Sequence, residues 1–337
     1  MKAGSLFSGI GGLDLGLERA GVEIVWQCEI DQNAQAVLRR HWPNTPIYDD
    51  VTQLKGGDLA PIDILCGGFP CQDLSMAGRR AGLAGEKSGL FFDFMRLAAE
   101  CGPAWVLIEN VPGLLSSNNG RDLGTVFRAL GELGYWWSWR VLDSQYFRVP
   151  QRRRRVFIIG NNRNRTAAAR VLFEPDICAF DAKASRRARK ANAKIVSQSF
   201  SEDSGRERAG FRRVEVFSAV DSFTNRVRIY HDIAPTLVCG NRKPDKGHPF
   251  LVVKHNDDDI VMRGFTPLEC ERLQGFPDHW TEGQADTVRY LQLRNAVCVP
   301  VAEWIGKRIV EVEANLNERK GSNGKHSRQA STTRGAE

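Results

Sequence analysis

Cys71 is the side chain in this sequence best placed to act as a nucleophile. It follows the apolar run Ile62 to Leu65 and the turn Gly67-Gly68-Phe69-Pro70, so a buried strand is expected to end just before it. In doubly wound sheets, ligands bind at the carboxyl ends of the strands. Because an isolated cysteine is usually a small buried apolar residue, a catalytic role for Cys71 depends on its neighbours at that edge.

A carboxylate, Glu109, ends the buried apolar run that begins at Trp105, and it is expected at the same edge as Cys71. A buried carboxylate costs free energy unless it binds a ligand or is protonated. A helix cap is the alternative, but Asp or Ser would fill that position better than Glu. We therefore interpret Glu109 as a functional residue.

Four consecutive arginines follow Gln151 and precede the apolar run Val156 to Ile159. Alternate side chains of an extended strand share a face, so Arg153 and Arg155 are expected to point together. If the apolar side chains fill the opposite face, this arginine pair faces the edge that carries Cys71. A solvated run of charges is the alternative interpretation.

The stretch that follows Cys71, from Gln72 to Lys87, is polar and rich in glycine, and it includes Ser75, Arg79 and Arg80. Such a loop can move, and its arginines can contact phosphate. The other seven cysteines are scattered, with no Cys-x-x-Cys pair and no histidine spacing typical of zinc. We expect neither a disulfide framework nor a metal site.

Near the start of the chain, Phe7-Ser8-Gly9-Ile10-Gly11-Gly12 forms a glycine turn between an expected strand and an expected helix. Glu29 follows 20 residues after Gly9, at the end of the second strand, where a carboxylate can bind both hydroxyls of a ribose. These features predict an adenosine site. Asp14 stands where a dinucleotide fingerprint has its third glycine, so S-adenosylmethionine, which has no phosphate, fits better than a pyrophosphate.

These motifs need a frame of alternating strands and helices. Strands are expected at 5–7, 23–29, 62–65, 105–109, 139–142 and 155–159, and helices at 13–20, 32–41, 90–101 and 123–133. This alternation predicts an α/β fold with a doubly wound, mostly parallel sheet covered by helices on both faces.

The chain of 337 residues is long enough for one large lobe and one small lobe. We expect a catalytic and cofactor-binding domain over 1–163, a small irregular lobe with some β structure over 164–262, helices that return to the large lobe over 263–318, and a disordered tail over 319–337. No apolar run reaches the roughly 18 residues of a membrane span, and no signal peptide precedes the first strand, so a cytoplasmic protein is expected.

Basic charge is concentrated in one segment. The whole chain has a net charge of +7, whereas residues 152–213 hold 17 basic and six acidic residues, a net charge of +11. Such a concentration is expected where a polyanion docks on one face, although a solvated basic linker would have the same composition.

Taken in order, these motifs resemble those of the DNA (cytosine-5) methyltransferases of the small bacterial or phage kind. The resemblance covers about residues 3–163 and 255–312, and it rests on the glycine turn, Pro70-Cys71-Gln72, Glu109-Asn110-Val111, Gln151 with Arg153 and Arg155, the stretch Arg263 to Gly275, and Asn295-Ala296-Val297. It implies a seven-stranded sheet that binds S-adenosylmethionine and, over about 164–262, a target-recognition lobe that reads DNA.

The resemblance also implies three groups of site residues. The catalytic group is Cys71, which adds to C6 of a flipped-out cytosine, Glu109, which supports N3 in its protonated form, and Arg153 and Arg155, which hold the base and the sugar-phosphate. The cofactor group is Phe7, Gly9, Gly11, Glu29, Ile30, Asp50, Val51, Pro70, Leu90 and Asn295. The DNA-binding group is Gln72, Ser75, Arg79, Arg80 and Gln151, to which the charge of the basic segment, and not a family motif, adds Arg186, Arg187 and Arg189.

The implied partner is double-stranded DNA, bound by a monomeric enzyme of restriction-modification or of phage or host DNA protection, with a cognate restriction endonuclease acting separately. Three alternatives remain open. A tRNA cytosine-5 methyltransferase would use the same motifs, but the Cys-Phe-Thr sequence of that branch is absent. A nicotinamide-dependent oxidoreductase would leave Cys71, Glu109 and the arginine pair unexplained, and a DNA-binding protein without catalysis is separated only by an assay.

The basic segment generates a first prediction. Replacement of Arg186, Arg187 and Arg189 by alanine should weaken DNA binding and flatten its salt dependence, by up to about 0.9 in the slope of log K against log salt for each phosphate that is no longer neutralised. Titration of a labelled duplex at several salt concentrations measures this slope. An unchanged slope would remove these arginines from the interface.

Overall fold

A seven-stranded sheet forms the centre of the large lobe. The computed structural model describes residues 1–69, 89–173, 211–218, 228–230, 234, 249–255 and 259–332. The strands are β1 (Lys2–Leu6), β2 (Glu23–Cys28), β3 (Ile47–Tyr48), β4 (Ile64–Gly67), β5 (Trp105–Asn110), β6 (Trp136–Asp143) and β7 (Arg154–Asn161), in the order β3-β2-β1-β4-β5-β7-β6. The first five are parallel, and β7 lies antiparallel between β5 and β6.

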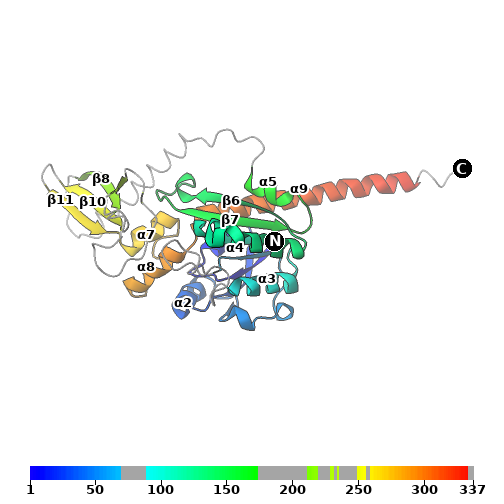
Figure 1. The fold of residues 1–337 in the computed structure, drawn as a ribbon, viewed down its shortest axis with the longest axis horizontal. Coiled ribbons are helices and arrows are strands. Elements are labelled where there is room, and N and C mark those ends of the chain that lie inside the picture. Colours follow the sequence, from blue (N-terminus) through cyan, green and yellow to red (C-terminus); the bar gives the residue numbers. More distant parts are fainter. Residues whose placement is uncertain are drawn as a thin grey trace.

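Helices cover both faces of this sheet, which confirms the predicted doubly wound architecture (Figure 1). They are α1 (Gly12–Arg19), α2 (Gln32–His41), α3 (Leu90–Cys101), α4 (Arg121–Glu132), α5 (Ala167–Leu172), α7 (Pro267–Gln274), α8 (Asp286–Asn295) and α9 (Val299–Thr332). Alternate residues of each buried strand enter different cores, because successive side chains of a strand point to opposite faces. Ile64 and Cys66 pack with α1 and α9, whereas Leu65 packs with α3.

Close packing of α9 against the start of the chain brings distant segments together. A Cβ atom on Gly12 would lie 2.4 Å from the carbonyl oxygen of Val297, and one on Gly16 would lie 2.4 Å from the Cβ of Ala302. Only glycine allows this approach, so the glycine turn and the segment before α9 are held side by side. Arg153 also contacts the segment before α9, because its Nη2 donates to the Arg294 carbonyl at 2.8 Å.

A buried polar network lies beneath the glycine turn. The Ser8 hydroxyl donates to Ser5 Oγ at 2.9 Å, Ser5 Oγ donates to Asp14 at 3.1 Å, and the Gln27 amide donates to the other oxygen of Asp14 at 2.8 Å. Burial raises the pKa of Asp14 to about 6, although these hydrogen bonds oppose the shift. Asp14, which sequence reasoning treats only as a missing glycine, therefore ties the turn to β1 and β2.

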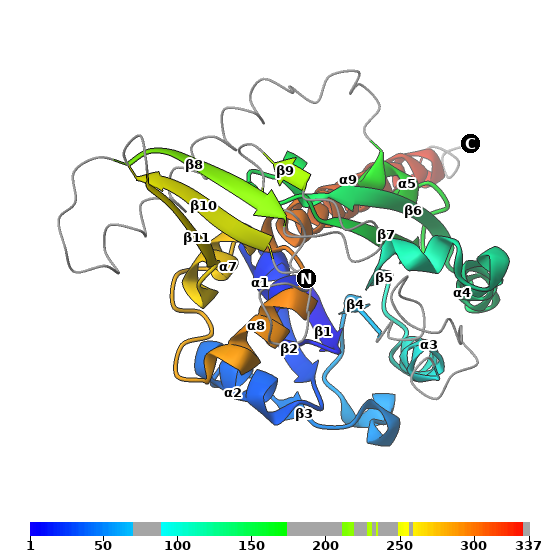
Figure 2. The same cartoon turned by 60° about the vertical axis from the view of Figure 1, so that its left-hand side comes forward.

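A second sheet lies at one end of the large lobe (Figure 2). It consists of β8 (Phe211–Ser218), β9 (Arg228–Tyr230), β10 (Pro249–His255) and β11 (Asp259–Gly264), all antiparallel, in the order β11-β10-β8-β9. Ala234 joins this region to the large lobe, because its N–H donates to the Pro150 carbonyl at 2.6 Å and its carbonyl accepts from the Arg152 N–H at 2.7 Å. The small lobe with some β structure therefore meets the hairpin between β6 and β7.

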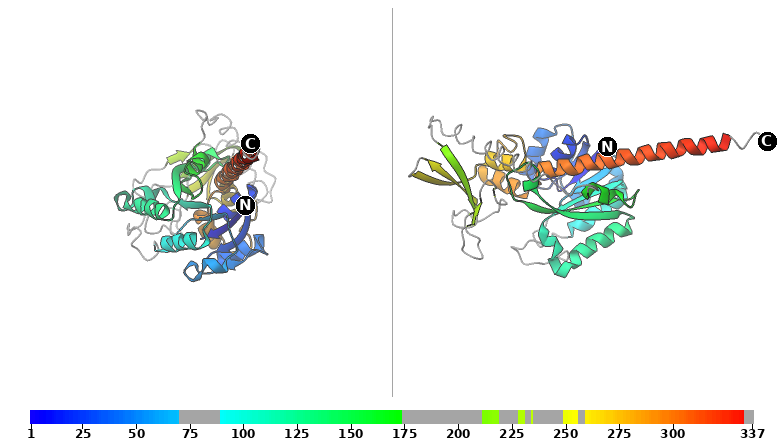
Figure 3. Two further views of the ribbon diagram at one scale, coloured as in Figure 1. Left: turned by 90° about the vertical axis from the view of Figure 1, so that its right-hand side faces the viewer. Right: turned by 90° about the horizontal axis from the view of Figure 1, so that it is seen from above.

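The structure differs from the expected domain limits at two places. The helix α5 buries its side chains in the core of the large lobe, so that lobe continues past the expected boundary at residue 163. The helix α9 continues to Thr332, whereas a disordered tail is expected from residue 319 (Figures 1 and 3). A helix that is already nucleated on a core adds one hydrogen bond per residue, and no proline interrupts this one after its first turn. Residues 333–337 lie outside the described residues.

Within the described ranges, no helix is both long enough and apolar enough to span a membrane.

Two glycine-to-alanine changes test the packing of α1 on α9. Gly16→Ala should lower the free energy of unfolding by about 1–3 kcal/mol, because the added methyl group overlaps Ala302 and the backbone of α9. The matched control is Gly124→Ala on α4, where the added Cβ meets no atom within 4 Å. That change should stabilise by up to about 1 kcal/mol, because alanine favours helix. Urea denaturation measures both, and equal effects would contradict the packing argument.

The raised pKa of Asp14 predicts a dependence of stability on pH. Because the folded-state pKa of about 6 lies above the ordinary value of 3.8, the protonated form is favoured by folding. Its contribution to stability is complete below about pH 4 and is lost as the pH rises through 6. The free energy of unfolding of wild type relative to Asp14→Asn should therefore fall between pH 4 and 7, by up to about 3 kcal/mol. A constant difference across this range in denaturant titrations would contradict the prediction.

Candidate active site

The glycine turn leaves open space beside its backbone. Phe7, Gly9 and Gly11 all have positive φ, at 54°, 57° and 80°. A Cβ atom on Gly9 would meet no atom within 4 Å, whereas one on Gly11 would lie 2.5 Å from the ring of Trp42. Gly11 therefore permits close packing with α2, and Gly9 exposes backbone to which a ligand can come close.

Glu29 links this turn to the start of α2. One carboxylate oxygen accepts a hydrogen bond from the Gly9 N–H at 2.7 Å, and the other accepts from the Asp31 N–H at 2.9 Å. Burial raises the pKa of Glu29, and the two N–H donors oppose that shift. Ile30, beside it, is 75% exposed, an unusual state for a large apolar side chain that follows a buried strand.

Negative charge gathers at the same end of β2. Asp50 accepts hydrogen bonds from the N–H and hydroxyl of Thr52 at 2.9 and 2.8 Å, and so caps the short 3-10 turn that begins at the buried Val51. The Cys28 thiol has its pKa raised to about 12, first by burial and then by the charges of Glu29, Asp50 and Asp49. The expected cofactor residues of β2 and of the Asp50 turn thus lie together.

Asn295 and Leu90 complete the expected cofactor group at the ends of helices. Asn295 is the exposed last residue of α8, and the carbonyls of its neighbours Arg294 and Ala296 accept hydrogen bonds from Nη2 of Arg153 at 2.8 and 2.7 Å. Leu90 is the half-buried first residue of α3.

The donor set around the turn suits S-adenosylmethionine. A carboxylate at Glu29 can accept from ribose hydroxyls, the exposed side chain of Ile30 offers an apolar surface to a purine ring, and Gly9 leaves room for approach. A phosphate would be repelled by Glu29, Asp49 and Asp50. The residues therefore fit a nucleoside cofactor without phosphates. In the described part of the chain, no three His, Cys, Asp or Glu residues form a metal-binding group.

Glu109 and Arg155 form a buried ion pair at the end of β5. Glu109 Oε1 lies 3.0 Å from Arg155 Nε, with side chains that are 11% and 16% exposed. Burial raises the pKa of Glu109, and the positive charges of Arg155 and Arg153 partly offset this. A Cβ atom on Gly68 would lie 2.8 Å from Glu109 Oε2, so the chain that leaves β4 passes directly beside this carboxylate.

The side chain of Arg153 takes a different place from that of Arg155. It is 1% exposed and points towards the segment before α9, where Nη2 binds the two carbonyls that flank Asn295. Its Nε and Nη1 atoms have no hydrogen-bond partner among the described residues. Burial, followed by the charge of Arg155, lowers the pKa of Arg153 to about 9. Arg155 thus pairs with Glu109, whereas Arg153 binds the backbone carbonyls on either side of Asn295.

Gln151, expected to contact DNA, is fully buried where the hairpin between β6 and β7 meets Ala234. Neither atom of its amide has a hydrogen-bond partner in the described ranges. Several expected site residues lie outside the described residues, namely Pro70, Cys71, Gln72, Ser75, Arg79, Arg80, Arg186, Arg187 and Arg189.

Sequence reasoning missed two contacts that organise this edge. The Trp280 indole donates to the Ile10 carbonyl at 2.8 Å, and so fastens the glycine turn to the segment between α7 and α8. The hydrogen bonds from Arg153 to backbone carbonyls are the other. Both contacts join residues that are far apart in the chain. Their acceptors are backbone carbonyls, which every residue has, so the sequence does not indicate them.

Known proteins are similar to this chain in sequence and in fold. Residues 1–311 match the family described as C-5 cytosine-specific DNA methylase. Type II methyltransferase M2.BsuMI of Bacillus subtilis (strain 168) is 32% identical over 95% of this chain and 78% of its own length. Type II methyltransferase M.Bsp6I of Bacillus sp. (strain RFL6) is 31% identical over 92% of this chain and 98% of its own length.

Among solved structures, the Dnmt2 methyltransferase of S. pombe has a TM-score of 0.65 at 18% identity, over 92% of this chain and 98% of that one, and so shows the shared fold. The family match spans both the glycine turn at the start of the chain and the segment around Asn295 that α9 holds against it. The chain therefore belongs to the C-5 cytosine-specific DNA methylases.

Proposed function

We propose that this protein uses Cys71 as a nucleophile to methylate carbon 5 of cytosine in a specific sequence of double-stranded DNA. The observation that carries the proposal is the Glu109–Arg155 pair, buried at the end of β5 with Gly68 against it. Only two residues lie between Gly68 and Cys71, so chain connectivity keeps the Cα atoms of these two residues within about 11 Å of each other. A thiol that follows Gly68 so closely in the chain can reach the side of Glu109 on which Gly68 lies, as catalysis on one small ring requires.

The chemistry requires activation of carbon 5, which is a poor nucleophile in aromatic cytosine. Addition of the Cys71 thiolate to C6 breaks the aromatic system and makes C5 electron-rich, provided that N3 is protonated or hydrogen-bonded. Bound S-adenosylmethionine supplies an electrophilic methyl group. After C5 accepts the methyl group, a base such as water takes the C5 proton. The electron pair of that C–H bond then re-forms the double bond between C5 and C6, the C6–sulfur bond breaks with its electrons returning to the Cys71 thiolate, and the ring regains its aromaticity.

Glu109 is the group that can serve N3. Burial favours its neutral form, in which the carboxyl donates a proton, while Arg155 favours the carboxylate. A base that displaces the remaining water would strengthen the effect of burial, since desolvation is the larger influence on this pKa. Arg155, beside Glu109, can then bind the base or the sugar-phosphate through a nitrogen that does not face the carboxylate.

Arg153 acts in this proposal as a positioning residue. Its hydrogen bonds to the carbonyls of Arg294 and Ala296 orient Asn295 at the edge that also carries Gly9 and Glu29. Those residues, with Ile30, Asp50, Val51, Leu90 and Phe7, would hold S-adenosylmethionine through its adenosine part. The cofactor site and the carboxylate are thus linked by one guanidinium.

The proposed substrate is double-stranded DNA, and the proposed role is in restriction-modification. Because the target atom is inaccessible in a duplex, the cytosine must be flipped out, at a cost of a few kcal/mol. The relatives described as Type II methyltransferases favour a role in restriction-modification, with a separate endonuclease as partner. We propose a monomeric enzyme that works on DNA in the cytoplasm.

Covalent trapping tests this function. A DNA duplex in which 5-fluorocytosine replaces cytosine has no C5 proton to lose, so the protein should remain attached through sulfur when S-adenosylmethionine is present. Cys71→Ser should abolish the adduct, and Glu109→Gln should slow its formation about 10²- to 10⁴-fold, the usual contribution of a positioned acid. Adducts are counted as shifted bands on denaturing gels.

The matched control is Cys101→Ser, a half-buried thiol at the end of α3 that should leave trapping unchanged. A tRNA containing 5-fluorocytosine distinguishes the competing substrate, because trapping on tRNA and none on DNA would contradict the proposal. So would an adduct that forms normally with Cys71→Ser. Bisulfite sequencing of DNA from expressing cells then identifies the target sequence.

A further inference from the structure

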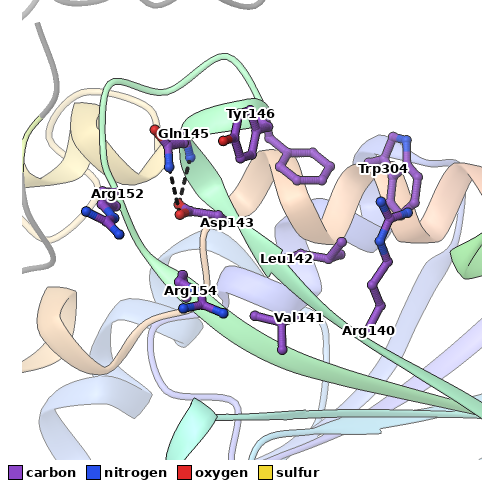
Figure 4. Close-up of a pocket in the computed structure, with 10 residues that line it drawn as sticks. Arg140, Val141, Leu142, Asp143, Gln145, Tyr146, Arg152, Arg154 and Trp304 are labelled. Atoms are coloured by element: carbon purple, nitrogen blue, oxygen red, sulfur yellow. Dashed lines mark hydrogen bonds between the residues drawn. The ribbon is translucent and has the colours of Figure 1, made fainter. Parts of the chain in front are cut away.

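A basic pocket lies along the open edge of the seven-stranded sheet, apart from the Glu109–Arg155 pair. It has a volume of about 450 Å³ and is bounded by the hairpin that joins β6 to β7 and by Trp304 of α9 (Figure 4). Pockets of 300–1,000 Å³ are typical of ligand sites. β6 is the last strand of the sheet, so one side of this pocket opens to solvent.

The arginine run divides between the two sites. Arg153 and Arg155 point to the backbone before α9 and to Glu109, respectively. Arg152 and Arg154 are exposed and line the pocket instead. The register explains this division, because Arg154 lies opposite Asp143 at the tip of the hairpin, one residue beyond the pairing of Arg155 with Leu142.

The pocket carries a positive charge that its own carboxylate does not cancel. Asp143 accepts hydrogen bonds from the N–H of Arg153 at 3.0 Å and from the side-chain amide of Gln145 at 2.8 Å, so its lone pairs are directed to the hairpin (Figure 4). Arg140 is fixed by a hydrogen bond to the Leu172 carbonyl at 2.8 Å. The guanidinium of Arg154 makes no hydrogen bond or ion pair with any described residue.

Aromatic side chains complete the walls. Tyr146 is 48% exposed, and Figure 4 shows its ring at the hairpin, beside Gln145. Trp304 is half-buried, with the guanidinium of Arg308 over its ring at 5.2 Å. Arginines interleaved with aromatic rings are typical of nucleic-acid contacts, where phosphates meet guanidinium groups and sugars or bases meet rings.

The position of the pocket indicates which kind of molecule would bind there. The hairpin tip lies at the same sheet edge as Glu109, because Asn110, the last residue of β5, pairs with Val156 of β7. On its other side the hairpin is bonded to Ala234 of the second lobe. Arg154 and Arg155 are consecutive residues, so an anion on the first lies within a few nucleotides of a base held by the second.

We propose that this pocket binds a backbone phosphate of the DNA strand that flanks the target cytosine. The inference rests on the proposed function and extends it, because it assigns a contact outside the base-flipping site. Arg154 supplies a guanidinium that pairs with no described residue, Arg152 and Arg140 add charge, and Tyr146 packs against the sugar. Such a contact reads no sequence but fixes the register of the duplex on the enzyme.

The test compares two duplexes that differ only in backbone charge. Both have 40 base pairs centred on the target found by bisulfite sequencing, and one of them carries uncharged methylphosphonates in place of the phosphates within a few nucleotides of the target. Wild type and Arg154→Ala are titrated with each duplex at several salt concentrations. On the all-phosphate duplex, Arg154→Ala should weaken binding about three- to tenfold near 0.1 M salt and reduce the slope of log K against log salt by about 0.9. On the methylphosphonate duplex, the two proteins should bind alike.

Two further variants serve as controls for the change in charge at Arg154. Arg128→Ala, an exposed arginine on α4 with the same change in charge, should behave as wild type on both duplexes. Arg154→Glu, which keeps a polar side chain at the exposed position, should weaken binding to the all-phosphate duplex more than the alanine variant does. An Arg154→Ala slope equal to wild type on the all-phosphate duplex overturns the proposal, as does an equal weakening on both duplexes.

Failure of the two proposals can be told apart. If wild type is trapped on 5-fluorocytosine DNA but Arg154→Ala shows no weakening that depends on the flanking phosphates, only the phosphate site is wrong. If wild type neither binds DNA nor forms the adduct, the proposed function fails together with the pocket that depends on it.

Discussion

A buried carboxylate that faces one guanidinium at the end of β5 is the constraint on which the active-site edge depends. Glu109 and Arg155 are almost excluded from solvent, and removal of either charge from such a pair typically costs about 3–5 kcal/mol. The pair exists because β7 runs antiparallel between β5 and β6, which brings the start of β7 beside the end of β5. An all-parallel sheet would place the start of that strand at the opposite edge.

The same reversal decides how four adjacent arginines are used. One face of β7 carries Arg153 and Arg155 towards Glu109 and the segment before α9, and the other face turns Val156 and Ile158 into the core that α3 and α4 cover. Arg154, which pairs with Asp143 where β6 ends, points to the other side of β7 from Arg153 and Arg155 and remains exposed. The four consecutive arginines thus have three different environments. Arg155 pairs with Glu109, Arg153 binds backbone carbonyls, and Arg152 and Arg154 are exposed.

Much of the frame can be predicted from the sequence, because periodicity records which faces are buried. The alternation of strands and helices, the sheet edge that carries Glu109, and the shared face of Arg153 and Arg155 all follow from local pattern. The hydrogen-bond partners of Arg153 cannot be predicted in this way, because they are the backbone carbonyls of residues 294 and 296, and every residue has such a carbonyl. The place of α5 is also hidden, because its short run of Ala and Val stands within an arginine-rich stretch and resembles a linker. Charge composition locates the basic segment but does not separate the arginines that are buried from those that stay exposed.

The cofactor edge is built from both ends of the chain, and this explains why its motifs lie so far apart. The glycine turn contacts Val297 through Gly12 and accepts a hydrogen bond from Trp280 at Ile10. Arg153 binds the same segment from β7. The segment from Arg294 to Val297 therefore touches both the glycine turn and Arg153, and the charge of Arg153 also opposes the raised pKa of Glu109. Because Arg153 is buried and its Nη2 binds two backbone carbonyls, it has little freedom to move away. Contacts between segments that are distant in the chain thus hold the glycine turn and the carboxylate at the end of β5 in their relative positions.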